Sequence, residues 1–176
     1  MPTTMQRKTF RDMQCPIARS LERVGEWWSI LILREAFYGT TRFDAFQKNL
    51  DIAPNMLTRR LNGLVDEGLL ERRQYSERPP RYEYVLTECG RDFEPVMLSM
   101  LAWGNKHFAP EGVSVQLVDK ATGAPIEPVL VDAASGAPVD LARYALAPGP
   151  AAGEGVRRRL ADAAAYLSTT EKAEAD

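Results

Sequence analysis

Residues 52–70, IAPNMLTRRLNGLVDEGLL, place their apolar positions with the period of a helix. The apolar residues recur at i, i+4, i+7 and i+8 and are Leu57, Leu61, Leu64 and Val65. Proline suits a first helical position and glycine commonly follows a helix, so Pro54 and Gly68 mark its start and end. The face opposite the apolar stripe is polar and holds Asn55, Thr58, Arg59 and Asn62.

The sequence before this helix predicts three more helical segments. Residues 16–39 divide at Gly25 into two pieces, and the second, WWSILILREAFYG, is apolar nearly all round, so we expect it to be the central buried helix. Within it, Trp28 is expected in the core and Trp27 more open, because successive residues of a helix do not share a face. RFDAFQKNL predicts a short amphipathic helix, and residues 51–53 then leave room for a tight turn.

After Gly68 the apolar period changes from that of a helix to that of a strand. LLERRQY and RYEYVLT are rich in aromatic and β-branched residues and enclose SERPP, which predicts a β-hairpin. Thr87 can then cap a helix that runs to about His107. Pro95 lies inside that pattern, so we expect either a kink there or a helix that begins near residue 94.

Beyond Pro110 the chain contains an internal repeat. LVDKATGAPI, residues 117–126, and LVDAASGAPV, residues 130–139, match at a spacing of 13 residues. In each unit an aspartate can hydrogen-bond the turn backbone and a glycine can adopt positive φ, which predicts a small antiparallel β-meander of about three strands. A linker and a short helix, VRRRLADAAAYLS, complete the chain, with a polar end that we expect to fray.

Composition narrows the class of protein. The chain of 176 residues is 45% hydrophobic and 26% charged, which fits one folded domain with an appendage. Its start lacks the apolar core of a signal peptide and no long apolar run follows, so we expect a cytoplasmic protein without a membrane partner. Two isolated cysteines, one histidine and no Gly-rich phosphate loop indicate no metal, no cofactor and no enzymatic activity.

The order helix, turn, helix, hairpin is that of a winged helix-turn-helix, and its second helix offers side chains to base edges in the major groove. Asparagine can pair with adenine and arginine with guanine, which suits the polar face of residues 55–62. Arg60, further round the helix, is expected at the DNA backbone. Arg78 and Arg81 flank two prolines at the hairpin tip and suit a minor groove or phosphates. Because Arg72 and Arg73 point to opposite faces, at most one of them can face the DNA.

Other interpretations of these features remain open. A helix with arginines on its outer face is commonly just a solvated helix, and winged helices also serve as protein-interaction modules that do not bind DNA. The polar face and the basic tip together favour DNA. Cys89 is interpreted as a small buried packing residue, and His107 as a surface or interface residue.

A set of motifs makes the chain similar to the HxlR family of bacterial winged-helix transcriptional regulators, distant relatives of the MarR type. The motifs lie within residues 13–108 and are the CP start, W-x-x-x-I-L-R-E, RF-x-x-F, P-x-M-L-x-x-R-L, EGL, R-x-x-Y-x-x-x-P-P-R-x-E-Y-x-L-T and a terminal WG. The resemblance implies a homodimer formed through the first and last helices of this region, with Pro54–Leu61 as the recognition helix and Ser76–Arg81 as the wing. It says nothing of residues 111–176.

The resemblance also implies signals to which the protein could respond. In redox-responsive members the cysteine of the CP motif, here Cys15, senses electrophiles or oxidants, and a helix N-terminus favours the reactive thiolate. Many members keep this cysteine without sensing, and this chain has no cysteine near residue 49, where some sensors hold the partner. Effectors of related regulators often bind between the dimer helices and the winged domain, which makes Trp27 a candidate for a small-molecule pocket. Family members commonly have serine where Ala53 stands, a better helix cap.

These observations predict an α+β protein. Residues 1–110 form a winged helix-turn-helix domain with a C-terminal dimerisation helix, residues 111–147 a β-rich extension, and residues 148–176 a linker with a short, partly disordered helix. The expected function is transcriptional regulation, by repression, through a homodimer on a palindromic double-stranded operator, which would make the protein nucleoid-associated. The candidate DNA contacts are Asn55, Thr58, Arg59, Arg60, Asn62, Arg78 and Arg81, and Cys15 is the candidate redox sensor.

Overall fold

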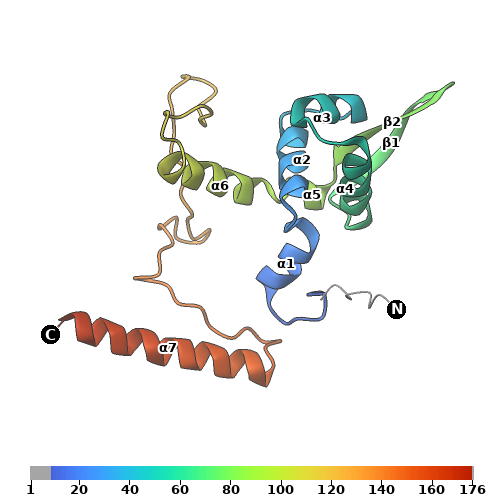
Figure 1. The fold of residues 1–176 in the computed structure, drawn as a ribbon. Coiled ribbons are helices and arrows are strands. Elements are labelled where there is room, and N and C mark those ends of the chain that lie inside the picture. Colours follow the sequence, from blue (N-terminus) through green and yellow to red (C-terminus); the bar gives the residue numbers. More distant parts are fainter. Residues whose placement is uncertain (1–8, 176) are drawn as a thin grey trace. The chain divides into compact units, whose positions relative to one another are not determined.

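The computed structural model describes residues 9–175, and the side chains of residues 9–166. The described chain contains helices and one projecting β-hairpin (Figure 1). The chain divides into two units, of which one is Arg23–Leu130. The other combines the residues before Arg23 with those after Leu130, and each unit is described by itself. Residues 1–8, where the first predicted domain begins, and residue 176 lie outside the described part.

The unit Arg23–Leu130 is built around the predicted helix-turn-helix. Helices α2 (Trp27–Phe37), α3 (Phe43–Leu50) and α4 (Pro54–Asp66) surround a core in which the largest fully buried side chains are aliphatic, apart from Phe46. Trp28 packs against this core while Trp27 is 75% exposed, as expected. Asp51 adopts a left-handed conformation with φ of 48° and ends α3, which makes the turn to α4 tight.

A buried carboxylate fixes the two helices that precede α4. Glu35 of α2 accepts hydrogen bonds from Asn49 Nδ2 at 2.9 Å and Arg34 Nη2 at 2.9 Å, and its backbone oxygen accepts from Thr40 N at 3.0 Å. Because Asn49 belongs to α3, the carboxylate links α2 to α3. This link could not be predicted from the sequence, because Asn49, the partner of Glu35, lies 14 residues later in another helix.

The predicted hairpin is confirmed and is longer than expected. Strands β1 (Leu70–Glu77) and β2 (Pro80–Leu86) pair antiparallel, with Leu70 opposite Leu86 and a register shift between Gln74 and Ser76. The backbone before α3 adds a short third segment, since Tyr84 N donates to Thr41 O at 2.7 Å. Together with the helices this makes the α+β winged helix that the sequence predicts, and the third segment is new.

The chain beyond the hairpin resolves the question about Pro95. Thr87 Oγ1 accepts from Gly90 N at 3.0 Å and so caps α5 (Glu88–Arg91), a single turn. A second helix, α6 (Glu94–His107), then begins with Pro95 in its first turn. The alternative in which the helix starts near residue 94 is therefore confirmed, since proline is tolerated where the helix amide has no partner.

The repeat forms turns rather than the predicted β-meander. Asp119 Oδ1 accepts from the amides of Ala121 and Thr122 at 2.8 Å each, and Gly123 follows with φ of 71°. The second repeat, residues 130–139, has an equivalent turn at Asp132 and Gly136. Each repeat contains one isolated β-bridge, which joins Val118 to Pro125 in the first and Val131 to Pro138 in the second. The described residues contain no strand in this region. The meander prediction was wrong, because prolines and short spacers let each turn close on itself without a partner strand.

The other unit contains most of α1 (Pro16–Val24) and the whole of α7 (Glu154–Ala175). Gly153 N, immediately before α7, donates to Gln14 Oε1 at 2.9 Å and so ties the start of this helix to the segment before α1. At 22 residues α7 is not the short helix that the sequence predicts. The polar end that was expected to fray has its side chains outside the described residues.

Candidate nucleic-acid interface

Helix α4 divides sharply into a buried and an exposed face. Leu57 and Leu61 are 0% exposed, which fixes the rotation of the helix about its own axis. Pro54 occupies the first turn, and Leu57 N donates to Ala53 O at 3.0 Å, so the helix begins where the proline predicts although Ala53 gives no side-chain cap. The exposed polar side chains on the other face are Asn55, Thr58, Arg59 and Asn62.

The polar residues of α4 differ in the hydrogen-bonding groups that they keep free. Thr58 Oγ1 donates to Pro54 O at 2.9 Å, so its hydroxyl proton is engaged within the helix and its oxygen lone pairs remain available as acceptors. Within the part of the chain that is described, Arg59 makes no side-chain hydrogen bond or ion pair, so its guanidinium is open to a ligand.

Arg60 has a structural role that the pattern of the helix does not predict. Its Nη2 pairs with Glu26 Oε2 at 2.9 Å, and its side chain is only 15% exposed. Glu26 stands immediately before α2, so the pair joins the start of α2 to the middle of α4. The expectation that Arg60 meets the DNA backbone is corrected, because the turn of the helix directs this side chain inward against the neighbouring helix.

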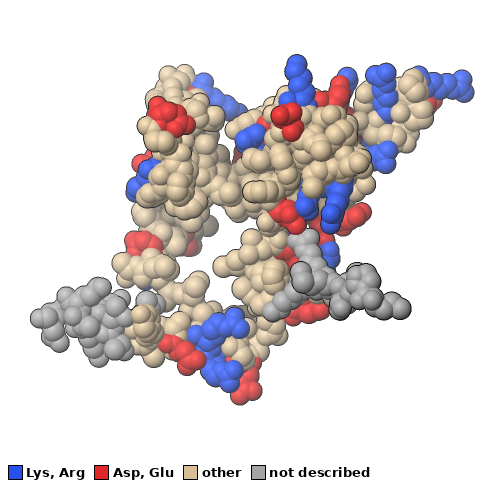
Figure 2. All heavy atoms as spheres, in the orientation of Figure 1, with Lys and Arg blue, Asp and Glu red and all other residues tan. Residues whose placement is uncertain are grey.

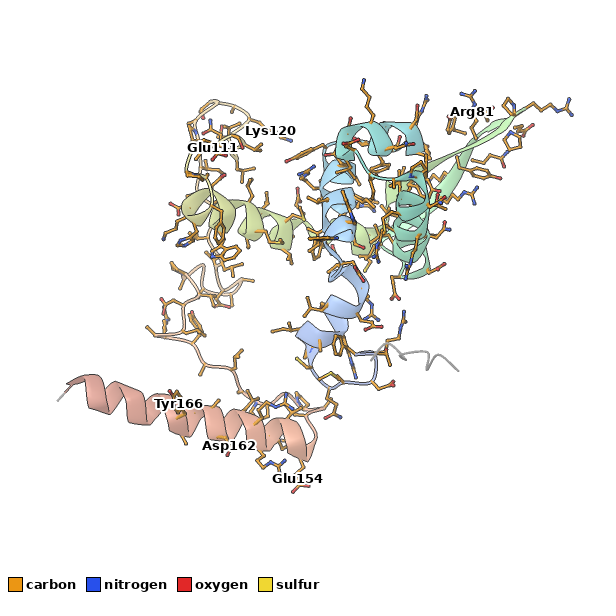
Figure 3. All side chains as sticks on the ribbon, in the orientation of Figure 1. Arg81, Glu111, Lys120, Glu154, Asp162 and Tyr166 are labelled. Carbon is orange, nitrogen blue, oxygen red and sulfur yellow. The ribbon has the colours of Figure 1, made fainter. Side chains whose placement is uncertain are left out.

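The hairpin carries the second group of candidate residues. Arg78 and Arg81 are exposed at its tip, and Figure 3 places Arg81 on the projecting ribbon. Ser76 Oγ donates to Pro79 O at 3.0 Å across the tip, and the Arg78–Pro79 bond is cis. Basic side chains are distributed along the whole projecting hairpin (Figure 2). Cationic side chains of this kind suit phosphates or a minor groove.

Two further arginines lie on tyrosine rings of the hairpin. The guanidinium carbon of Arg72 is 3.7 Å from the centroid of the Tyr82 ring, and that of Arg42 is 4.6 Å from the Tyr75 centroid. Arg73, by contrast, pairs with Glu71 on its own strand. The alternation of arginine and tyrosine in the sequence was the available signal, but which ring meets which arginine depends on the strand register.

One of the two cysteines lies in the setting that the sequence predicts, and the other does not. Cys15 is partly buried, and its carbonyl accepts from Arg19 N at 3.0 Å, so it stands at the start of α1 as predicted. Cys89 is exposed, and the interpretation as a buried packing residue was wrong. It sits in the one-turn helix α5, whose buried residue is Gly90 instead.

The last helix of the family-like region exposes a row of apolar side chains. Val96, Met100 and Trp103 recur at i, i+4 and i+7 along α6 and are 46%, 42% and 58% exposed. Phe108, 64% exposed, continues the row through an edge-on contact with Trp103, at 4.8 Å between ring centroids. His107 is exposed beside both rings. Exposed apolar rows of this kind are typical of surfaces that bind another protein.

The described residues offer little to other kinds of chemistry. They contain no group of three or more His, Cys, Asp and Glu side chains arranged to hold a metal ion. None of the helices in the described range combines the length and apolar character needed to cross a membrane. The arrangement on α4 and the hairpin therefore remains the main candidate site.

Comparison with known proteins gives consistent matches. The sequence profile of the HxlR-like helix-turn-helix family matches residues 23–112. An uncharacterized HTH-type transcriptional regulator of Mycobacterium tuberculosis, Rv3095, is 38% identical over 146 residues, which cover 82% of this chain and 90% of the relative. The solved structure of PA1374 from Pseudomonas aeruginosa, described as a candidate transcription factor, is 57% identical with a TM-score of 0.61 and covers 83% of this chain and 100% of its own.

A second solved structure, PA1607, is likewise described as a candidate transcription factor. It has a TM-score of 0.72 at 34% identity and covers 81% of this chain and 100% of its own. Matches of this extent reach beyond residue 112. These relatives therefore share at least part of the extension as well as the winged helix.

Proposed function

Since the chain belongs to the HxlR-like helix-turn-helix family of transcriptional regulators, we propose that it reads a palindromic operator as a homodimer through the polar face of α4. The observation that carries this proposal is the division of that helix. Its three leucines are buried, and Asn55, Thr58 and Arg59 are exposed near the N-terminal end. Recognition helices offer bases the residues near that end.

Each exposed residue suits a particular contact. Asn55 can pair with adenine, Arg59 can pair bidentately with guanine, and Thr58 can accept from a base amino group because its proton is already engaged. Asn62 lies a further turn along and is a weaker candidate. Arg60 is left out of the proposed set, since its pairing with Glu26 holds it against α2.

The hairpin serves as the wing in this proposal. Its exposed tip arginines, Arg78 and Arg81, would reach a minor groove or its phosphates beside the major groove occupied by α4. In a dimer, two α4 helices about 34 Å apart would enter successive major grooves on one side of the duplex.

The proposed homodimer would form through the apolar row of α6. In α1, the first helix of the family-like region, Ile17 and Leu21 are also exposed and apolar. Met100→Glu should convert the dimer to monomers, because a carboxylate would be buried in the apolar contact without a partner. Ser99→Glu adds the same charge one position away, off the row, and serves as the control. Sedimentation equilibrium distinguishes the outcomes: equal dimer content in wild type and Met100→Glu would reject α6 as the interface.

The regulatory output proposed is repression, which an oxidant or a small molecule would relieve. Cys15 is the proposed sensor because it stands at the start of α1, immediately before the helix that carries Ile17 and Leu21. Diamide should then weaken operator binding by the wild type and leave Cys15→Ser unaffected. An equal response of both proteins would exclude Cys15.

The experiment for DNA binding is a gel shift with the region upstream of the protein's own gene, competed with unrelated DNA of equal length. We expect a shifted band that survives the competitor. Absence of any shift, with the protein folded and dimeric, would favour a protein-interaction module instead.

A further inference from the structure

The wing holds two arginines in place with aromatic rings rather than with carboxylates. Arg72 lies 3.7 Å from the Tyr82 ring centroid and Arg42 lies 4.6 Å from that of Tyr75. Neither arginine has a carboxylate partner among the described residues, whereas Arg73 on the same hairpin pairs with Glu71. All three arginines are exposed, so the difference lies in their partners.

The strand register places the two stacked pairs on opposite faces of the hairpin. Arg72 is opposite Tyr84, and Gln74 is opposite Tyr82, so Arg72 and Tyr82 share the face of the buried Tyr84. Arg42 bridges to Glu83, which lies on the other face.

Tyr75 reaches Arg42 from an irregular part of the strand. The register shifts between Gln74 and Ser76, and such a bulge re-aims a side chain relative to a regular strand. The hairpin is therefore built with one stacked arginine on each face, between the buried core and the exposed tip.

A stacked guanidinium is well suited to bind phosphate. Stacking occupies the flat face of the group and leaves its N–H edge free, and that edge matches the oxygens of a phosphate bidentately. The ring also limits the number of side-chain conformations, so less conformational freedom is lost when the anion binds. An arginine already paired with a carboxylate is also ordered, but its N–H edge and its charge are engaged by that carboxylate.

We propose that Arg42 and Arg72 are DNA phosphate contacts, one on each face of the wing, with Tyr75 and Tyr82 as the residues that position them. The minor groove is bordered by two phosphate backbones, so a hairpin whose tip enters it presents one face to each. This replaces the expectation that only one face of the hairpin can meet the DNA. The inference rests on the proposed function, in which Arg78 and Arg81 bring the tip to that groove. It extends the contact from the tip toward the base of the wing.

The test is the salt dependence of binding to a fluorescein-labelled duplex from the upstream region, measured by anisotropy. Each phosphate contact contributes about 0.9 to the slope of log K against log salt concentration. Arg42→Gln and Arg72→Gln should each lower the slope by about 0.9 per subunit, and the double variant by about twice that. Arg73→Gln removes the same charge from the same hairpin and should leave the slope nearly unchanged, because Arg73 is paired with Glu71.

The tyrosines test positioning separately from charge. Tyr82→Leu keeps the charge of Arg72 and should keep the slope, but affinity should fall about 2- to 10-fold because the freed arginine must be ordered on binding. Tyr82→Phe keeps the ring and should bind like the wild type. Thermal unfolding of each variant confirms that the fold is unchanged.

The outcomes separate the inference from the proposed function. If the wild type binds with a steep salt dependence and either arginine variant keeps the full slope, the two-faced contact is wrong while DNA binding stands. Wild-type affinity in Tyr82→Leu would overturn the positioning role. A wild type that does not bind DNA overturns the proposed function and this inference with it.

Discussion

Truncation of Arg60 should lower the free energy of unfolding, whereas truncation of its neighbour Arg59 should leave it nearly unchanged. Its side chain is 15% exposed and pairs at 2.9 Å with Glu26, whose side chain is 33% exposed. Removing one partner of a fully buried pair costs about 3–5 kcal/mol, and exposed pairs contribute about 0–1 kcal/mol. This partly covered pair lies between these limits, so we expect a loss of about 1–3 kcal/mol in the free energy of unfolding.

The assay is urea unfolding followed by circular dichroism, with Arg59→Ala as the matched control on the same helix. Since Arg59 is exposed and makes no side-chain hydrogen bond or ion pair in the described part of the chain, its removal should change the free energy of unfolding by less than about 0.5 kcal/mol. A double-mutant cycle with Glu26→Gln should give a coupling energy of about 0.5–3 kcal/mol. An Arg60→Ala protein as stable as the wild type, or a coupling energy of zero, would refute the structural role assigned to Arg60.

Three further predictions concern other parts of the chain. Gly90→Ala should lower the free energy of unfolding of the winged helix by more than about 2 kcal/mol, because the added methyl group would overlap the backbone oxygen of Leu69. Urea unfolding measures this change, and a variant as stable as the wild type would contradict the close contact. Hydrogen bonds from Thr122 hold the pKa of Asp119 below its usual range. The ionised carboxylate therefore stabilises the turn above about pH 4, and this stabilisation is lost as the pH falls through the lowered pKa. An NMR titration of the Thr122 amide should therefore have its midpoint below the usual aspartate value, and a midpoint at that value would disprove the hydrogen bonds. Truncation after residue 112 should leave the free energy of unfolding nearly unchanged, since the apolar core lies between Val24 and Tyr84, and loss of the folded state would show that the extension supports it.

The winged helix could be predicted because its sequence signals are local. The period of Leu57, Leu61 and Leu64 gives the burial of α4, and Pro54 gives its start. The two strands follow from a change of period around a proline-rich turn. These signals depend on neighbouring residues alone, so a single sequence contains them.

Features that depend on contacts between distant residues could not be predicted in the same way. Arg60 looks as polar as Arg59, and only the position of Glu26, 34 residues earlier, shows that it points inward. The stacking of Arg42 on Tyr75 requires the register of a strand and the approach of a separate segment.

In the repeat, the local pattern predicted the turns correctly, but the prediction that the segments between them form a sheet was wrong. The turns at Asp119 and Asp132 have the hydrogen bonds that the sequence predicts. A sheet also needs extended residues between the turns that can pair, and the structure forms only isolated bridges there. The pattern specified the turns and contained no information on pairing.

Base recognition by α4 is the central claim, and binding by Arg59→Ala tests it most directly. Affinity for an operator mapped in the upstream region should be measured by anisotropy for wild type and variant, with the operator and with single-base changes in each half-site. The account predicts a loss of about 1–3 kcal/mol in binding free energy, about 5- to 150-fold, together with relaxed preference at one base pair of each half-site. Unchanged affinity and unchanged preference at every position would contradict it.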